Sequence, residues 1–167
     1  GIGVQGLADV FAIMGLSYDS PKARDINVKI FATIYHSALT TSYLLAVERR
    51  EAIQEIKAFC PSRSSWGKLF RDPDNPVSRN YLSVGELKKA LTSDSDTIYL
   101  SRSSAITRLA DLLTQIRPTP SELECEMPGS YSSFVGSPLS EGRFQFDLWE
   151  GTIPCPMYDW NDLRARI

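Results

Sequence analysis

The chain has 167 residues, of which 43% are hydrophobic and 23% are charged, a composition typical of a globular domain with a core of its own. Its formal net charge of −2 provides no basic field that would attract a nucleic acid or an acidic membrane surface. We find no apolar run near the roughly 20 residues that span a bilayer, and therefore expect neither a nucleic acid nor a membrane as partner.

The first six residues, GIGVQG, match the G-x-G-x-x-G pattern of dinucleotide-binding enzymes. In those enzymes a buried strand leads into the first glycine, and a second strand carries an acidic residue about 20 positions later. Here residues 17–25 (SYDSPKARD) are turn-forming and charged, and Asp25 does not end a strand. A dinucleotide-dependent enzyme is therefore the weakest of our three hypotheses. We interpret the glycines as residues that let a helix approach its neighbours closely.

The spacing of apolar residues predicts two helices in the first third of the chain. The first covers residues 3–15 and ends at Gly15, because glycine can close a helix in the left-handed conformation. Its apolar stripe consists of Leu7, Val10, Phe11 and Met14. The second begins at Pro21, after the capping residue Ser20, and continues to about residue 47. Its apolar face is wide, so we expect it to be buried from more than one side.

The next part of the chain mixes charged helix and loop. Residues 48–57 (ERREAIQEIK) either continue the long helix or begin another one, with charges that can pair across an exposed face. Prolines, serines and a glycine in residues 60–82 predict a loop. Ser83 and Glu86 fit a capping box in front of a short helix.

Two further short elements are expected before a second loop. Residues 97–100 (TIYL) predict a short strand. A helix capped by Ser103 or Ser104 follows and ends before Pro118. Residues 117–130 contain three prolines and three glutamates and predict a loop.

The C-terminal part, from Tyr131 onward, is rich in aromatic residues and glycines and has little helical periodicity. It predicts extended chain and turns that cover a larger body. Asp159 can cap a last helix, whose apolar face is formed by Trp160, Leu163 and Ile167. That helix lacks a C-cap, and the chain starts within an apolar pattern, so we expect a piece of a longer protein.

Few residues could carry chemistry. The three cysteines, Cys60, Cys125 and Cys155, are far apart and form no C-x-x-C pair, which argues against a zinc or redox motif and favours a reducing, cytoplasmic setting. The one histidine, His36, is interpreted as a core or rim residue in contact with a neighbour. No P-loop, nucleophile elbow or H-E-x-x-H occurs. We therefore predict no catalytic, cofactor-binding or metal-binding residue.

Both ends of the sequence resemble one family. Residues 1–20 (GIGVQGLADVFAIMGLSYDS) and 23–46 (ARDINVKIFATIYHSALTTSYLLA) are similar to the large (alpha) subunit of class I ribonucleotide reductase, in its eukaryotic and viral branch. Three C-terminal segments follow in the family's order: GSPLSEG at 136–142, QFDLW at 145–149 and DWNDL at 159–163.

The resemblance implies a domain organisation. Residues 1–47 and 129–167 correspond to segments of the family's ten-stranded α/β barrel, and we expect the chain as a whole to be mainly α-helical with long loops. Residues 48–128 match nothing in the family pattern and are interpreted as an insertion of unknown role at a surface turn, where long insertions cost little loop entropy. A retained intron is the alternative explanation.

The resemblance also implies a function. The family reduces ribonucleoside diphosphates to deoxyribonucleotides for DNA synthesis through a cysteine thiyl radical, with thioredoxin or glutaredoxin as reductant. It uses ATP and deoxynucleotide effectors and a small subunit with a metal-linked radical. The implied partners are the rest of the large subunit, the small subunit and a nucleoside diphosphate. The family's N-x-C-x-E segment does not occur here, and Cys60, Cys125 and Cys155 match none of its functional cysteines, so no catalytic residue is carried over.

The leading hypothesis is thus a fragment of a reductase large subunit that is inactive alone. The alternative is a non-catalytic helical interaction module that is derived from reductase segments and uses the insertion to bind a protein partner. Under the leading hypothesis, the apolar faces of the first two helices lack their partners. We therefore expect the isolated chain to expose apolar patches and to associate.

Overall fold

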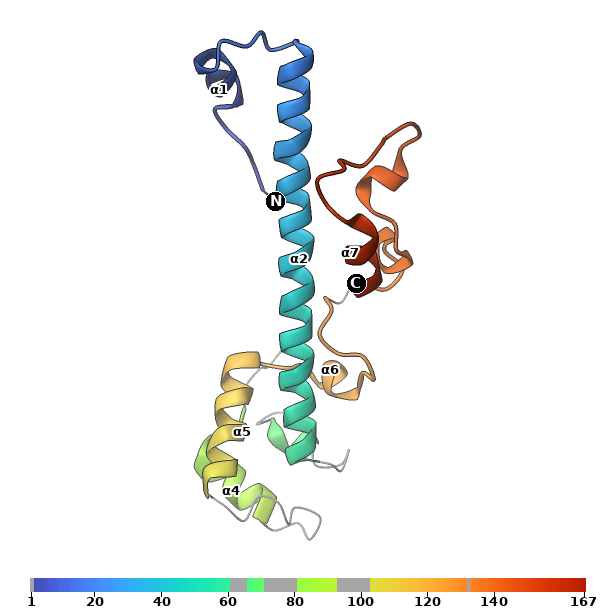
Figure 1. Ribbon diagram of the computed structural model, residues 1–167. Helices are drawn as coiled ribbons and strands as arrows, with labels where there is room; N and C mark the ends of the chain where they lie inside the picture. Colours follow the sequence, from blue (N-terminus) through green and yellow to red (C-terminus); the bar gives the residue numbers. More distant parts are fainter. Residues whose placement is uncertain (1, 61–65, 71–80, 93–102, 132) are drawn as a thin grey trace. The chain divides into compact units, whose positions relative to one another are not determined.

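The computed structural model describes residues 2–60, 66–70, 81–92, 103–131 and 133–167, and within them the secondary structure is helical (Figure 1). In chain order the elements are α1 (Leu7–Ile13), α2 (Pro21–Phe59), η1 (Gly67–Leu69), α4 (Val84–Thr92), α5 (Ser103–Ile116), α6 (Pro120–Glu124), η3 (Pro138–Glu141), η4 (Gln145–Leu148) and α7 (Trp160–Arg166), where η denotes a 3₁₀ helix. The described residues contain no β-strand, only an isolated bridge between Phe70 and Tyr81. The expectation of a mainly α-helical segment is confirmed.

The chain divides into two compact units, each with its own buried cluster. Unit 1 comprises Gly1–Tyr43 and Ser133–Ile167, and unit 2 comprises Leu44–Ser132. Unit 1 is therefore discontinuous in sequence, whereas unit 2 is one continuous segment. The long helix α2 contributes its first part to unit 1 and its second part to unit 2.

Helix α1 is shorter than the apolar stripe predicted. It begins after Gly6, whose φ of 77° is left-handed and cannot continue a right-handed helix, so the predicted start at residue 3 is wrong. The glycine after the helix behaves as expected, because Gly15 has a φ of 64°. Phe11 is the buried residue of α1, so most of the apolar stripe stays exposed in this chain.

Helix α2 begins where the sequence predicted but extends well beyond residue 47, to Phe59. The Ser20 hydroxyl accepts a hydrogen bond from the backbone N–H of Ala23 at 3.2 Å, which caps the first turn. Residues 48–57 continue this helix rather than begin another, because α2 contains no glycine and no proline after its first residue.

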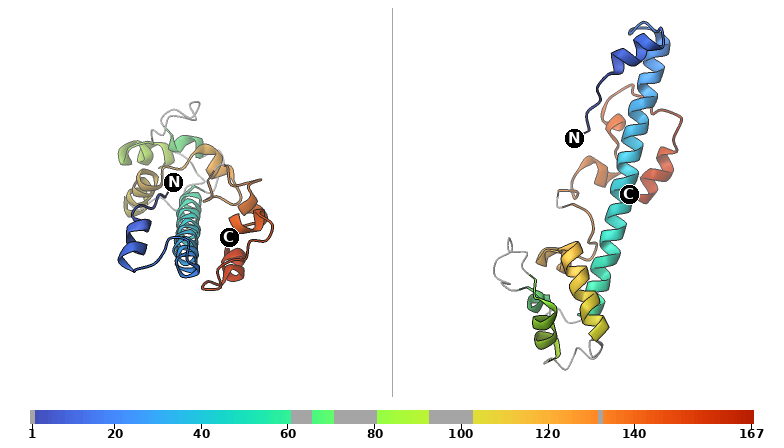
Figure 2. Two further views of the ribbon diagram at one scale, coloured as in Figure 1. Left: turned by 90° about the horizontal axis from the view of Figure 1, so that it is seen from above. Right: turned by 90° about the vertical axis from the view of Figure 1, so that its left-hand side faces the viewer.

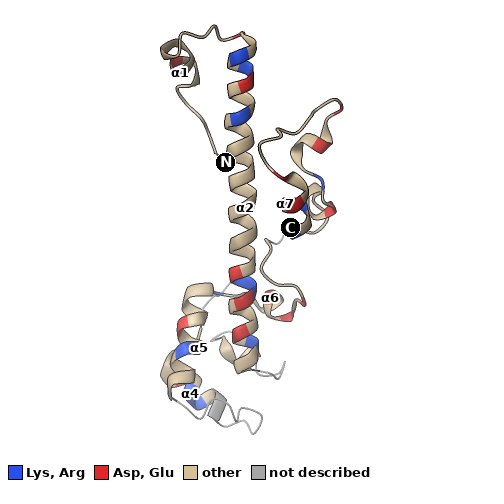
Figure 3. Ribbon diagram, in the orientation of Figure 1, with Lys and Arg blue, Asp and Glu red and all other residues tan. Residues whose placement is uncertain are grey.

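Residues 30–47 of α2 carry no charged side chain, as the uninterrupted tan stretch of the helix in Figure 3 shows. An 18-residue window of α2 has a mean hydropathy of 1.3, so by length and composition alone this helix is able to cross a membrane. The expectation that no apolar run comes near this length was wrong. Core helices of soluble proteins meet the same criterion, yet none of this window is buried within the chain. The uncharged surface of α2 is therefore only partly covered here, because Ala32, Tyr35 and Leu39 pack against the buried cluster of unit 1 without being fully buried.

Unit 2 is built around the second part of α2, with α5 lying alongside it (Figures 1 and 2). Arg108 of α5 and Glu55 of α2 form a bidentate ion pair, with both N–O distances at 2.9 Å. The buried cluster of this unit consists of Ile53, Ile56, Cys60, Leu69, Phe70, Leu87, Ile106, Leu109, Ala110, Leu112, Leu113 and Leu123. These mostly aliphatic side chains give unit 2 a hydrophobic core of its own.

The short-range signals in unit 2 are partly confirmed. Helix α4 follows Ser83, whose backbone N–H donates to the Glu86 carboxylate at 2.8 Å, as in a capping box. Helix α5 ends before Pro118, as predicted. Within the predicted loop 60–82, the described residues include the short helix η1. The strand predicted at residues 97–100 lies outside the described residues.

Helix α6 lies in residues 117–130, which the sequence predicted to be loop, and that prediction was wrong in part. The Thr119 hydroxyl accepts from the backbone N–H of Glu122 at 3.3 Å, and the Glu122 carboxylate accepts from the backbone N–H of Thr119 at 2.8 Å. These two bonds form a capping box, and Pro120 occupies the first helical position, where its missing N–H is not needed. The signal, T-P-S-E, was therefore present in the sequence.

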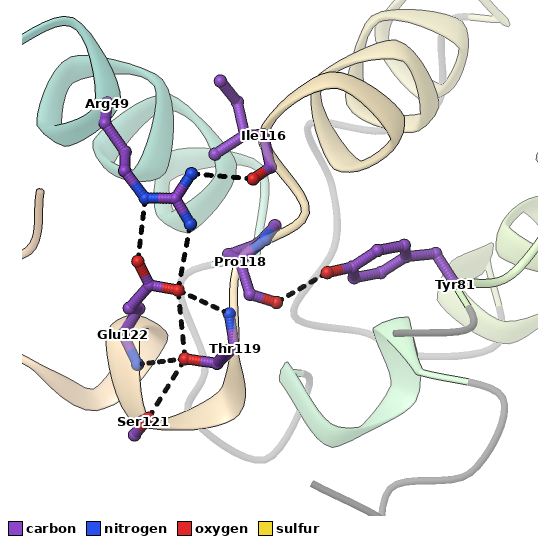
Figure 4. Close-up of polar contacts among 7 residues, drawn as sticks. All are labelled: Arg49, Tyr81, Ile116, Pro118, Thr119, Ser121 and Glu122. Carbon is purple, nitrogen blue, oxygen red and sulfur yellow. Dashed lines mark hydrogen bonds and ion pairs between the residues drawn. The ribbon is translucent and has the colours of Figure 1, made fainter. Parts of the chain in front are cut away.

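Arg49 of α2 holds α6 through a group of polar contacts that we name the Arg49 clasp, formed with Ile116, Thr119 and Glu122 (Figure 4). The Arg49 Nε and Nη2 atoms donate to the two carboxylate oxygens of Glu122 at 2.8 and 3.1 Å, and Nη1 donates to the Ile116 carbonyl oxygen at 2.8 Å. The Glu122 carboxylate also accepts from the Thr119 hydroxyl at 3.0 Å. The clasp thus joins α2 to the end of α5 and the start of α6.

Lowering the pH is expected to weaken the Arg49 clasp and destabilise unit 2. Burial alone would raise the pKa of Glu122, but hydrogen bonds from Arg49 and Thr119 outweigh it and hold that pKa below its usual value. A carboxyl group whose pKa is lower in the folded state stabilises the fold at pH values above its unfolded pKa, which is near 4.5. This stability is lost as the pH falls through the lower pKa of the folded state.

Hydrogen exchange in α5 and α6 at a series of pH values measures this effect. We expect exchange, corrected for its intrinsic pH dependence, to accelerate as the pH falls below the usual carboxyl value near 4.5. Glu122→Gln removes the titrating group, so the variant is expected to show a smaller dependence on pH. An unchanged dependence in this variant would contradict a role for Glu122.

The C-terminal part of unit 1 forms short helices joined by turns, where extended chain and turns were expected. Its last helix, α7, begins as predicted. The Asp159 carboxylate accepts from the backbone N–H groups of Asn161 and Asp162 at 3.1 and 2.9 Å, which satisfies donors that the helix itself leaves free. Trp160 and Leu163 form the buried face of α7.

Candidate functional site

The side chains that could carry chemistry are not gathered. Among the described residues, no group of three or more His, Cys, Asp or Glu side chains lies close enough to hold a metal ion. Cys60 is buried in the core of unit 2, and this burial raises the pKa of its thiol to about 11. Cys125 is exposed, and Cys155 is buried in unit 1. That the chain carries no catalytic, cofactor-binding or metal-binding residue stays a prediction.

His36 belongs to an aromatic cluster in unit 1, in agreement with its interpretation as a core or rim residue. Its ring stacks on that of Tyr158, with the centroids 4.3 Å apart and the planes at 17°. The same ring meets Trp160 edge to face at 5.3 Å. Both contacts are packing interactions of an aromatic surface, so His36 serves the structure of unit 1.

Trp160 lies at the centre of this cluster and is only 7% exposed. Five rings surround it at centroid distances from 5.0 to 6.0 Å: those of Tyr35, His36, Phe144, Phe146 and Tyr158. The indole N–H donates to the Cys155 carbonyl oxygen at 2.8 Å, so its polar atom is satisfied although it is buried. Trp160 therefore joins α7 to α2 and η4 within unit 1.

Two tyrosine hydroxyls fasten the C-terminal part of unit 1 to α2. The Tyr35 hydroxyl accepts from the backbone N–H of Gln145 at 3.0 Å, and the Tyr158 hydroxyl donates to Thr33 Oγ1 at 2.8 Å. Burial raises the pKa of Tyr35, because desolvation disfavours the charged phenolate. The partners are 110 and 125 residues apart in sequence, so these bonds help to make one unit of two distant segments.

Arg164 of α7 holds the neighbouring helix η4. Its guanidinium donates to the Asp147 carboxylate at 2.7 Å and lies over the Phe144 ring, 5.1 Å from the centroid. The Asp147 carboxylate also accepts from the backbone N–H of Phe144 at 2.8 Å. About a third of each side chain of this ion pair is exposed, so the pair contributes modestly to stability and chiefly orients η4.

An apolar groove opens beside the aromatic cluster, between α2 and the segment from η4 to α7. Its volume is about 300 Å³, and none of its lining residues is charged. The lining is formed by Asn27, Val28, Phe31, Ala32, Tyr35, Gln145, Phe146, Trp149, Thr152, Ile153, Pro154, Cys155 and Trp160. Ile153 is 86% exposed, Trp149 62% and Phe31 46%. Large apolar side chains exposed together are typical of a surface that contacts another protein segment.

The sequence alone did not predict this groove. Its α2 residues belong to the wide apolar face that the helical periodicity indicated. Trp149 and Ile153 lie in a segment without periodicity, where no pattern shows which side chains face α2. The groove arises because the aromatic cluster brings this segment onto the helix.

Comparison with known proteins gives consistent matches. The chain matches the family model for the ribonucleotide reductase barrel domain over residues 1–167. It is 29% identical over 169 residues to the ribonucleoside-diphosphate reductase large subunit of Acanthamoeba polyphaga mimivirus. This match covers 100% of this chain and 10% of the relative. It is 56% identical over 167 residues to the ribonucleoside-diphosphate reductase large subunit of Monkeypox virus. This match covers 100% of this chain and 11% of the relative.

A further relative shows a shorter and well-conserved match. The large subunit of Arabidopsis thaliana is 56% identical over 46 residues, which cover 28% of this chain and 6% of the relative. No solved structure matches the chain. The chain spans about a tenth of the length of the two viral large subunits that it matches from end to end. Because the family model covers the whole sequence, the chain belongs to the ribonucleotide reductase family and corresponds to part of its barrel domain.

Proposed function

We propose that the chain is part of the large subunit of a ribonucleoside-diphosphate reductase, which reduces ribonucleoside diphosphates to deoxyribonucleotides for DNA synthesis. The observation that carries this proposal is the barrel-domain match along the whole chain, together with relatives of that name. Since the chain spans about a tenth of those relatives, the activity belongs to the complete subunit. The chain contributes structure to it and is inactive alone.

The proposed parent enzyme is a cytoplasmic, ten-stranded α/β barrel that works with a small subunit carrying a metal-linked radical. ATP and deoxynucleotides act on it as effectors. The described residues of this chain bring together no metal-binding group of three or more side chains, and we place no step of the reaction on them. Catalytic and effector residues are assigned to the rest of the large subunit.

The apolar groove of unit 1 supports this structural role. We propose that another segment of the large subunit packs into it through apolar side chains. The lining is uncharged, and residues 30–47 of α2 are at most partly buried within the chain, so a charged ligand would find no partner there. Large subunits roughly ten times longer than the matched region contain the additional chain that the groove requires.

Replacing Ile153 by aspartate is expected to weaken self-association of the isolated chain. Ile153 is 86% exposed within the groove, so the substitution costs the unit little while placing a charge on the apolar surface. Burying an isoleucine stabilises by about 1.5–3 kcal/mol, so we expect association to weaken by about tenfold or more. Sedimentation velocity at several concentrations measures the change.

Val135→Asp is the matched control for this substitution. Val135 is 87% exposed, also belongs to unit 1, and does not line the groove. It introduces the same charge and is expected to leave association unchanged. Equal weakening by the two variants would show that net charge rather than the groove controls association.

The proposed activity is tested in a complete large subunit. In a chimaera, this chain replaces the matching tenth of the mimivirus large subunit, and reduction of a ribonucleoside diphosphate is measured with the matching small subunit and a dithiol reductant. We expect reduction by the chimaera and none by the isolated chain. A chimaera that folds and binds the small subunit without reducing the substrate contradicts the proposal. That result favours a non-catalytic interaction module instead.

A further inference from the structure

We infer that residues 48–128 form a self-contained folding module, inserted into the barrel segment at one turn of α2, and that unit 1 folds without it. This inference goes beyond the proposed reductase function, which assigns no role to the segment. It rests on three observations. The two ends of the segment lie next to each other on α2, the buried cluster of unit 2 lies within the segment, and several polar contacts join residues of the segment to one another.

The two ends of the segment meet on α2. Gly129 packs so closely against this helix that an added Cβ would lie 2.3 Å from the Ala46 carbonyl oxygen and 3.1 Å from the Arg50 Cβ. Ala46 and Arg50 are one turn apart in α2. The chain therefore returns to the same helical turn at which the segment begins. A folded segment whose ends are adjacent can be inserted into a protein without displacing its flanks.

The core of unit 2 lies entirely within the segment. All members of its buried cluster fall between Ile53 and Leu123. The partly buried side chains packed against that cluster are also inside it, from Ala52 to Ile116. Unit 1 shows the converse, because its buried cluster and the side chains packed on it lie before residue 48 or after residue 128. Among the described residues, each unit thus has the hydrophobic core that independent folding requires.

Four polar contacts among the described residues of the segment also have both partners inside it. The Arg49 clasp and the pair between Glu55 and Arg108 connect α2 to α6 and α5. Lys57 Nζ donates to the Cys125 carbonyl oxygen at 2.7 Å. The Tyr81 hydroxyl donates to the Pro118 carbonyl oxygen at 2.6 Å (Figure 4). In this segment the helix caps, the apolar periodicity and the contacts between its own residues all agree with one fold, which is typical of a sequence selected to fold. This agreement favours a protein module over a retained intron.

The lengths of the aligned regions support an insertion. In the Arabidopsis relative, 46 residues make up 6% of the protein. The two viral relatives, matched along the whole chain, contribute only 10% and 11% of their length. In a subunit as long as the Arabidopsis relative, 167 aligned residues would make up about twice the share of 10–11% that is found. For relatives of that length, this is the share expected if a segment of the size of residues 48–128 has no counterpart in them.

Excision from the full chain tests the inference. Residues 48–128 are replaced by two glycines, so that Val47 leads to Gly129, and hydrogen exchange is followed in η4 and α7. We expect exchange rates there to stay within about threefold of those of the intact chain. Trp66 leaves with the segment, so near-ultraviolet circular dichroism then reports on Trp149 and Trp160 of unit 1. Loss of exchange protection in α7 overturns the inference.

Core substitutions in the intact chain provide a second measurement that does not depend on the new junction. Leu113 and Leu163 are buried in unit 2 and unit 1, respectively. We expect Leu113→Ala to accelerate exchange in α4 and α5 by about tenfold or more and to leave α7 unchanged. Leu163→Ala is the matched variant and is expected to accelerate exchange in α7 alone. Acceleration in the other unit by either variant overturns the inference.

Discussion

Replacing Trp160 with alanine is expected to destabilise unit 1 by about 3–5 kcal/mol, the range found for large aromatic side chains truncated in a core. The Trp160 side chain is 7% exposed and is surrounded by five aromatic rings. Alanine leaves a cavity among these rings and removes the donor to the Cys155 carbonyl oxygen. Hydrogen exchange in η4 and α7 measures the loss, and exchange in α5 is expected to stay unchanged.

Trp149→Ala is the matched control for this prediction. Trp149 belongs to the same unit, but it is 62% exposed at the groove and has no part in the buried cluster. We expect it to change stability by less than about 1 kcal/mol. Equal destabilisation by the two variants would show that the aromatic cluster does not hold unit 1 together.

Gly129→Ala is expected to destabilise unit 2 by about 2–6 kcal/mol, which combines two costs. A non-glycine residue at the φ of 116° found here is strained by about 1–3 kcal/mol. The added Cβ would also lie 2.3 Å from the Ala46 carbonyl oxygen. Because this atom is backbone in the middle of α2, relief requires a shift of the chain, at about 1–3 kcal/mol. Chemical denaturation, with exchange in α5 and α6 as probe, measures the total.

Gly151→Ala separates the two costs. Gly151 has a positive φ of 74°, but nothing lies within 4 Å of a Cβ placed there. This variant therefore carries backbone strain, about 1–2 kcal/mol, without the clash, and because Gly151 belongs to unit 1 this cost is measured by exchange in α7. We expect Gly129→Ala to cost about 1–3 kcal/mol more than Gly151→Ala. If Gly129→Ala and Gly151→Ala destabilise their units equally, the close contact between Gly129 and α2 does not stabilise unit 2.

Signals that act over a few residues could be predicted from the sequence. Asp159 and Ser20 cap helices as expected, because a side-chain oxygen needs only the next two or three N–H groups. The capping box at Thr119 is equally local, and α6 was missed because the surrounding prolines indicated a loop. The family was also predicted, from segments at the two ends of the chain, and the family model matches residues 1–167.

The candidate site could not be predicted in the same way. The bond from Tyr158 to Thr33 joins residues 125 positions apart, and no periodicity in either segment shows that they meet. The length of α2 could not be predicted either, because the charged residues at 48–57 are equally compatible with a continuation of α2 and with a separate exposed helix. Its continuation is stabilised by Ile53 and Ile56, which lie in the core of unit 2. Burial in tertiary structure, rather than local propensity, decided these features.

The contact between Gly129 and Ala46 has a practical consequence for protein engineering. Two points of the backbone that are separated by 82 intervening residues lie in van der Waals contact. This turn of α2 is therefore a natural grafting point for other domains whose termini are close together. A fluorescent or ligand-binding domain placed between Val47 and Gly129 is expected to leave the aromatic cluster around Trp160 intact.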